Sequence, residues 1–202
     1  EPLLDQPMGF NVWRAPTDND RKLKADWYAA HYDHAATNAY HTEYTVTASG
    51  VTLHTHVGIA AICVQKFLDL DVTWTVANNG SVDLALHATR NTVFPELPRF
   101  GLRLFLPQEM SQVNYYGMGP MECYRDKHHA ASHSSYTATV WQLHEDYIRP
   151  QEIGSHFDCD YVMLAGDAVR LTAVGTQPFS FYASHYTQEE LTRKAHNYEL
   201  EP

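Results

Sequence analysis

The stretch FLDLDVTWTVANNGSVDLALHATRN, residues 67–91, decides the fold class of this chain. Its two runs, FLDLDVTWTVAN and VDLALHATRN, alternate apolar with polar side chains and are rich in Val, Thr and Leu, which is typical of strands with one buried face. Between them lies Asn78-Asn79-Gly80, and Asn and Gly accept the positive φ that a tight hairpin turn requires. The stretch therefore predicts an antiparallel β-hairpin.

The same pattern extends along most of the chain. Ala165-Gly166-Asp167 predicts a second hairpin between DYVML and AVRLTAV, and further strands are predicted for TEYTVTA, VTLHTHV, GLRLFLP, VNYYGM, YTATVWQL and FSFYASHY. Turn signals recur at the spacing of a β-sandwich, and strands do not alternate with long helices. We expect an all-β fold in which residues 1–202 form a single domain.

Two short helices are also predicted. RKLKADWYAAHYD, residues 21–33, has helix-forming residues and one apolar stripe, and Asp20 is available as its N-cap. TQEELTRKAHNYEL, residues 187–200, has the order of a capping box. In that motif the Thr187 hydroxyl binds the amide of Glu190, and the Glu190 side chain reaches back to the cap amide.

Composition excludes several functions. The chain has 24 acidic and 14 basic residues, a formal charge of −10, and no clustered Lys and Arg for a nucleic-acid partner. No apolar run reaches the roughly 18 residues of a membrane span. Cys63, Cys123 and Cys159 lie far apart, and their odd number indicates reduced thiols and a cytosolic setting. The chain begins with Glu rather than Met and has no signal-peptide pattern, so we expect a part of a longer protein.

The 13 histidines raise the hypothesis of a metal site. His54 and His56 alternate on a predicted strand, so both rings would face the same way, as an H-x-H pair of ligands requires. The sequence does not identify a third ligand, and a solvent-facing strand surface is the favoured interpretation. His144-Glu145 begins like H-E-x-x-H, but Ile148 takes the place of the second histidine. We predict no metal and no cofactor in this chain.

Carboxylates are the remaining catalytic candidates. A glycosidase uses two carboxylates roughly 5 to 9.5 Å apart, and Asp18, Asp20, Glu122 and Asp126 lie in unusual contexts. Asp, Asn and Pro together also form turns and caps, and we favour this structural interpretation. Gly117-Met118-Gly119-Pro120 begins like a dinucleotide-binding loop, but no glycine follows at the required spacing. No catalytic residue is assigned.

Four stretches, taken in order, resemble the C-terminal β-sandwich domain, or small chain, of the β-galactosidases of glycoside hydrolase family 2. The stretches are WRAPTDND (13–20), YGMGPMECYRD (116–126), YIRPQEIG (147–154) and FSFYASHY (179–186). They span nearly the whole chain, and four ordered matches are more specific than any one of them. The structural signature consists of Trp13, Arg14, Asp18, Asn19, Asp20, Gly117, Gly119, Pro120, Glu122, Tyr124 and Asp126. Cys123, Arg149 and Ile153 depart from the family's usual pattern.

The resemblance implies a fold and a role. The implied fold is a twisted two-sheet supersandwich, similar to galactose mutarotases, with one or two short helices. WRAPTDND would fix the entry of the chain into the domain by ion pairs of Arg14 and by turns, with Trp13 buried. The implied role is non-catalytic: the domain packs against a separate β/α barrel that carries the catalytic glutamates, and it helps to shape the sugar pocket. The substrate-binding tryptophan of the family lies in a later segment, so we expect this chain to be truncated at its C-terminal end.

The resemblance also implies properties of the parent enzyme. It would hydrolyse terminal β-D-galactosides with retention, in the bacterial cytoplasm, as an oligomer with Mg and Na as possible cofactors. Two alternatives stay open for this chain. It could be an independent carbohydrate-binding module, since it has 13 tyrosines and 4 tryptophans. It could instead be a mutarotase-like epimerase, with acid and base drawn from His54, His56, His87 and Glu122.

Overall fold

The computed structural model describes residues 3–202. It is mostly β, with three antiparallel sheets and two α-helices, so the predicted all-β fold with short helices is confirmed. The chain divides into two compact units, each described by itself below. The β2–β5 unit comprises Gly9–Trp13 and Asn19–Arg103; the β7–β10 unit comprises Arg14–Asp18, Leu104–Pro202 and the N-terminal residues up to Met8. The single domain over residues 1–202, of which 1 and 2 lie outside the described residues, stays a prediction.

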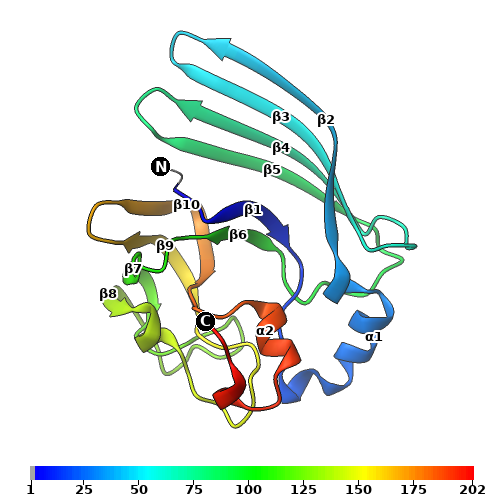
Figure 1. Ribbon diagram of the computed structural model, residues 1–202, viewed down its shortest axis with the longest axis vertical. Coiled ribbons are helices and arrows are strands. Elements are labelled where there is room, and N and C mark those ends of the chain that lie inside the picture. The colour runs from blue at the N-terminus through cyan, green and yellow to red at the C-terminus, as the bar shows by residue number, and fades with distance from the viewer. Residues whose placement is uncertain (1–2) are drawn as a thin grey trace. The chain divides into compact units, whose positions relative to one another are not determined.

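One unit contains a four-stranded antiparallel sheet in the order β2-β3-β4-β5 (Figure 1). Its strands are β2 (Ala36–Thr47), β3 (Gly50–Ala60), β4 (Leu68–Ala77) and β5 (Val82–Arg90). The hairpin predicted over residues 67–91 is therefore confirmed. Its turn contains Gly80 at a φ of 88°, and the Asn79 side chain accepts a hydrogen bond from the amide of Ser81 at 3.0 Å. Gly80 thus has the positive φ expected for the turn, whereas Asn78 and Asn79 do not, and Asn79 contributes a side-chain hydrogen bond instead.

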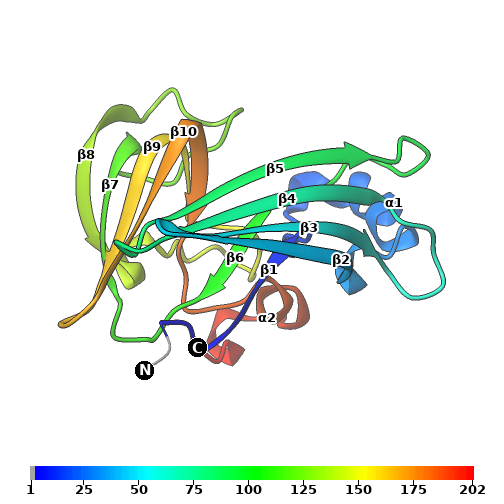
Figure 2. The same ribbon diagram turned by 90° about the horizontal axis from the view of Figure 1, so that it is seen from above.

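The core of this unit lies where the helix α1 (Leu23–Ala29) meets the sheet. The buried side chains are Val12, Trp13, Trp27, Ala30, Tyr32, Val57, Ile59, Phe67, Leu68, Leu70 and Val72. In Figures 1 and 2, α1 lies at one end of the sheet, and the turns that join β2 to β3 and β4 to β5 lie at the other. The core therefore covers only part of the apolar face of these strands.

The first helix is shorter than the sequence predicts and lacks the predicted cap. α1 is flanked by the 3-10 turns η1 (Asp18–Arg21) and η2 (Tyr32–His34). Its N-cap is Lys22, which already has helical φ and ψ and makes no side-chain cap hydrogen bond. The expected cap at Asp20 is wrong, because η1 leads directly into the helix and Asp20 is buried within that turn.

The other unit contains a four-stranded sheet in the order β10-β9-β7-β8. Its strands are β7 (Gln112–Gly119), β8 (Ser132–Thr139), β9 (Ser155–Ala165) and β10 (Arg170–Tyr182). The second predicted hairpin is confirmed, and its turn is closed by a hydrogen bond from the amide of Gly166 to the carbonyl of Val169 at 3.0 Å. The stretches predicted as two strands, AVRLTAV and FSFYASHY, form the single strand β10, whose register shifts between Val174 and Phe179.

The second helix begins as predicted and ends early. α2 spans Gln188–Arg193, and Thr187 Oγ1 accepts a hydrogen bond from the amide of Glu190 at 3.1 Å. The prediction that the helix continues to residue 200 is wrong, since a separate turn, η4 (Asn197–Glu199), follows. The Glu190 carboxylate accepts hydrogen bonds from Arg193 at 2.5 Å and from the Glu201 amide at 3.3 Å. The Glu190 side chain therefore does not make the second hydrogen bond of the predicted capping box, which would go to the amide of Thr187.

The remaining elements are one short sheet and one turn. β1 (Gln6–Asn11), which the sequence does not predict, pairs with β6 (Gly101–Phe105). The end of the predicted strand YTATVWQL is the 3-10 turn η3 (Val140–Leu143), held by a capping box between Thr139 and Gln142. Within residues 3–202, no helix has the length and apolar character needed to cross a membrane.

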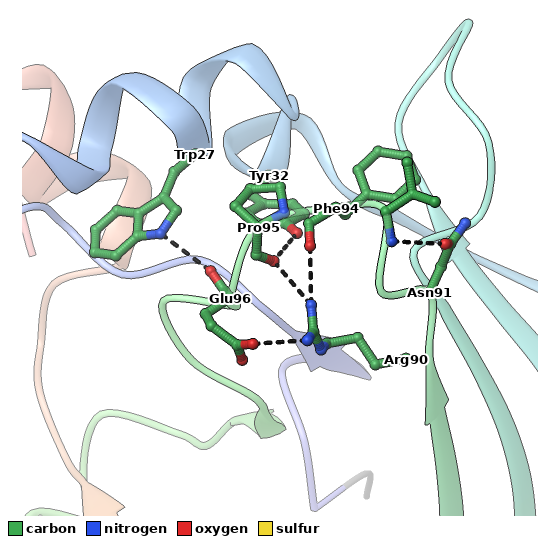
Figure 3. A network of polar contacts seen from close by, with 8 residues as sticks. Trp27, Tyr32, Arg90, Asn91, Phe94, Pro95 and Glu96 are labelled. Carbon is green, nitrogen blue, oxygen red and sulfur yellow. Dashed lines mark hydrogen bonds and ion pairs between the residues drawn. The ribbon is translucent and has the colours of Figure 1, made fainter.

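The connection after β5 is held to α1 by a polar network (Figure 3). The Arg90 guanidinium donates to the Glu96 carboxylate at 2.6 Å, Trp27 Nε1 donates to the Glu96 carbonyl at 3.1 Å, and Tyr32 Oη donates to the Pro95 carbonyl at 2.7 Å. The backbone carbonyls of this irregular segment thus find side-chain donors, as buried polar groups require.

Replacing Tyr32 with phenylalanine is expected to lower the free energy of unfolding by about 1 kcal/mol, because it removes one hydrogen bond while leaving the buried ring in place. Urea unfolding of the purified chain measures the change. Tyr44→Phe is the matched control, since the Tyr44 side chain is exposed, and it should cause no comparable loss. Equal effects of the two substitutions would show that the Tyr32 hydroxyl contributes nothing specific.

Candidate functional site

The structure places the signature residues in three regions. Trp13 is only 3% exposed, and its ring lies 5.2 Å from that of Tyr28. The turn η1 contains Asp18, Asn19 and Asp20, the strand β7 contains Gly117 and Gly119, and the segment after β7 contains Pro120, Glu122, Tyr124 and Asp126. Gly117 has no room for a side chain, because a Cβ there would collide with Cys159 of β9. The ion pair expected for Arg14 stays a prediction.

Among the candidate carboxylates, Glu122 has a well-defined set of partners. Its side chain is buried and accepts hydrogen bonds from four groups, which we call the Glu122 cluster. Lys127 Nζ, at 2.7 Å, and Tyr147 Oη donate to Oε1. Tyr124 Oη, at 3.1 Å, and the amide of Gly154, at 2.9 Å, donate to Oε2. Both oxygens of the carboxylate are therefore engaged.

The chain folds locally to bring these groups together. Tyr124 and Lys127 exchange backbone hydrogen bonds of 2.9 and 3.0 Å, which closes a tight turn with Arg125 and Asp126 exposed at its tip. The amide of Cys123 donates to the carbonyl of Ser155 at 2.8 Å, so the segment that carries Glu122 is fixed beside the start of β9. Asp126, another candidate from the sequence, is exposed at the tip of this turn.

The electrostatics of the cluster keep Glu122 ionised. Burial by itself would raise the pKa of this carboxyl, but the hydrogen bonds from Lys127, Tyr147 and the Gly154 amide outweigh it and hold the pKa below its ordinary value. The hydrogen bonds to Glu122 and Tyr147 raise the pKa of Lys127, so the ammonium stays charged. Burial raises the pKa of Tyr124, which remains a protonated donor. The arrangement is a charge-assisted structural clamp.

The stability that Glu122 provides should depend on pH in one direction. Because its pKa in the folded chain lies below the ordinary value of 4.5, its contribution is fully present above that pH and is lost as the pH falls through the folded pKa. The difference in unfolding free energy between the chain and Glu122→Gln, which does not titrate, should therefore be constant near neutral pH and shrink below pH 4.5. Urea unfolding from neutral to acid pH measures it. A difference that grows toward acid pH would contradict the assignment.

The histidine candidates belong to the polar face of sheet β2–β5. His54 Nδ1 lies 2.9 Å from Thr73 Oγ1, while His56 has Asp71 Oδ1 3.0 Å from Nδ1 and Asp69 Oδ1 3.3 Å from Nε2. Both rings do share one face, as the alternation predicts. Among residues 3–202, however, no group of three or more His, Cys, Asp or Glu side chains is placed to hold a metal ion.

The epimerase alternative draws its acid and base candidates from both units. His54, His56 and His87 lie on β3 and β5 of one unit, whereas Glu122 belongs to the other unit and is engaged by its own neighbours. A carboxylate that is ionised and has both oxygens occupied has no free lone pair directed at a substrate. No observation favours the epimerase.

Sequence reasoning did not foresee the partners of Glu122. Lys127, Tyr147 and Gly154 come from segments up to 32 residues away, and no spacing rule connects them. The one signal was indirect: Tyr147 and Gly154 are the two ends of the stretch YIRPQEIG, which also carries the family resemblance.

Comparison with known proteins places this all-β chain among domains of β-galactosidases. The chain belongs to the family described as Beta galactosidase small chain, whose model matches residues 1–202. The resemblance inferred from the four stretches is thus confirmed.

The similar proteins are much longer than this chain. A β-galactosidase of Actinobacillus pleuropneumoniae is 43% identical over 199 residues, which are 98% of this chain and 19% of that protein. A β-galactosidase of Staphylococcus xylosus is 36% identical over 200 residues, 99% of this chain and 20% of that protein. One from Pseudoalteromonas haloplanktis is 28% identical over 217 residues. The chain spans about one fifth of the length of these bacterial relatives.

Proposed function

We propose that this chain is the non-catalytic C-terminal sandwich domain of a family 2 β-galactosidase that hydrolyses terminal β-D-galactosides with retention. In this proposal the two sheets form a supersandwich that packs against the catalytic barrel and helps to shape the sugar pocket. The nucleophile and the acid/base belong to the barrel, in the part of the parent that is not included in residues 1–202. Membership of the small-chain family supports this role.

The observation that carries the proposal is the state of Glu122. Retaining hydrolysis needs one carboxylate free to attack the sugar and one carboxylic acid whose pKa is raised so that it can protonate the leaving group. The pKa of Glu122 is lowered, and both of its oxygens are occupied by Lys127, Tyr147, Tyr124 and the Gly154 amide. This carboxylate of the signature is therefore suited to neither role and is suited to bracing loops.

The setting of the parent enzyme is part of the same proposal. We place it in the bacterial cytoplasm as an oligomer, with the galactoside contacted by this chain only indirectly. In the same proposal this chain holds no cofactor, and any Mg²⁺ or Na⁺ is held by the rest of the parent. No step of the hydrolysis is assigned to a metal here.

A hydrolysis assay tests the proposal. We expect the purified chain to release no product from a chromogenic β-galactoside above the buffer rate, while the whole parent enzyme turns it over. In the parent, Glu122→Gln should lower the thermal midpoint but leave kcat of the folded enzyme close to that of the unmodified protein. Hydrolysis by the chain alone, or loss of kcat in a fully folded Glu122→Gln parent, would refute the non-catalytic role.

Sugar binding by the chain itself is a second candidate function, favoured by one observation. Trp141 is 49% exposed, and its ring is held by stacking on His185 at 4.3 Å and by an edge contact with Tyr186 at 5.9 Å. An exposed, fixed indole suits the apolar face of a sugar ring. Galactose or lactose should then quench tryptophan fluorescence saturably in the unmodified chain and not in Trp141→Ala. The absence of saturation in the unmodified chain would exclude this function.

A further inference from the structure

One face of the sheet β2–β5 is apolar beyond the part that the core covers. At the end remote from α1, the strand register forms two neighbouring rows of four residues, one from each strand. We call these rows the apolar strip, which consists of Val46, Val51, Val76 and Val82 in one row and Tyr44, Leu53, Trp74 and Leu84 in the other. Because side chains two residues apart on a strand point the same way, both rows lie on one face.

Four of the eight residues of the apolar strip are exposed, including Val76 at 39%, while Trp74 and Leu84 are partly buried against the core of the same unit. Tyr44 is 70% exposed, Val46 67% and Val82 54%. Toward α1, the same face continues into Leu70 and Val72, which are buried in the core. The strip is therefore the partly covered extension of a surface that is buried elsewhere in the same sheet, and its exposed residues lie at the end remote from the core. Contiguous exposed apolar surface of this kind marks an interaction site in a folded protein.

The reverse face of the same strands has the opposite character. The alternating rows on this face are one of Thr45, Thr52, Thr75 and Asp83, which lies between the two rows of the strip, and one of Glu43, His54, Thr73 and Ala85, which follows the Tyr44 row. An antiparallel sheet with one apolar and one polar face is arranged to bury the first and to hydrate the second. The apolar strip thus belongs to a sheet with one apolar and one polar face, and its exposure leaves the apolar face partly unburied.

We propose that the apolar strip is a docking surface for the remainder of the parent β-galactosidase polypeptide, which covers it with an apolar surface of its own. This inference rests on the proposed function, in which the chain is one domain of a longer enzyme. Relatives that match 98 to 99% of this chain extend well beyond it, since the match covers only 19 to 20% of their length. About four fifths of such a protein is thus available as the partner.

Covalent attachment and charge favour this occupant over a second copy of the chain. A tethered partner has a high effective concentration, so a surface of moderate size stays covered without strong intrinsic affinity. Two copies would each bring a formal charge of −10, which includes Glu43 and Asp83 on the reverse face of the same strands. Mutual repulsion disfavours pairing of two such surfaces.

Thiol labelling of the folded parent enzyme tests the proposal. The variants Val46→Cys and Val82→Cys place a thiol on the strip, and Thr45→Cys and Asp83→Cys place one on the reverse face of the same two strands. A maleimide is added, and modification is followed at each site by peptide mass spectrometry, which separates the new thiols from native ones such as exposed Cys63. We expect the strip sites to react about tenfold or more slower than their neighbours, and all four to react equally in denaturant.

Three results would overturn the inference. The first is equal labelling of the strip and reverse-face sites in the folded parent. The second is protection that disappears when the parent is diluted to its monomer, because the strip would then be covered by a second copy. The third is an intact, active parent carrying Val46→Glu and Val82→Glu together with an unchanged thermal midpoint. None of these three results would refute the proposed function, because the proposed function is tested by whether the chain alone hydrolyses galactosides.

Discussion

Replacing Glu122 with alanine should lower the free energy of unfolding by about 3 kcal/mol, one of the two largest effects expected in this chain. The substitution leaves four donors without their acceptor, and two of them, the Gly154 amide and Tyr124 Oη, lie in a region where water does not readily replace the lost carboxylate. Lys127 is more exposed and can return to solvent, which limits the loss. Urea unfolding of the purified chain at neutral pH measures the effect.

The control for this substitution is Asp126→Ala. Asp126 is an acidic residue of the same turn, but it is exposed at the tip, so its removal should change the midpoint little. If Glu122→Ala proved as stable as Asp126→Ala, the Glu122 cluster would not be the clamp described above.

Trp13→Ala should destabilise the β2–β5 unit by about 3 to 5 kcal/mol, the cost typical of removing a buried aromatic side chain and leaving a cavity. Trp13 is almost fully buried and packs against Tyr28 and the core around α1. At about 2 to 4 °C per kcal/mol for a chain of this size, the melting midpoint should fall by roughly 10 °C. Differential scanning calorimetry measures the shift.

The chain offers a control of the same residue type. Trp141→Ala removes an indole that is about half exposed, so it should lower the midpoint much less than Trp13→Ala. A similar loss in both variants would mean that the entry stretch WRAPTDND does not anchor the core through Trp13.

The strand pattern was predictable because it is local, and the exceptions have physical causes. Alternation and the Asn-Gly turn define residues 67–91 without reference to the rest of the chain. β1 was not predicted, because Pro7 and Gly9 read as breakers and its pairing with β6 depends on residues about 90 positions away. β10 was split in two because Gly175 and Pro178 read as a turn, whereas the structure accommodates them in a register shift.

The geometry of the candidate site was not predictable from the sequence, and the structural role assigned to its residues stays a prediction. Reading Glu122 as structural followed from its context, and the resemblance indicated which stretches belong with it. The actual donors could not be named, because the side chains of Lys127 and Tyr147 and the amide of Gly154 meet only when three loops are folded against β7 and β9. Helix boundaries failed for a related reason, since the 3-10 turn before α1 has no distinctive residue pattern.

The Glu122 cluster has a consequence for how this chain fluctuates. A single side chain holds the turn at Tyr124–Lys127, the Tyr147 loop and the start of the segment leading to β9 at Gly154. None of these segments can swing outward without releasing the same carboxylate, so they should open as one event. In deuterated buffer, the amides of Cys123, Lys127 and Gly154 should therefore exchange with a common opening equilibrium, distinct from that of the sheet β2–β5.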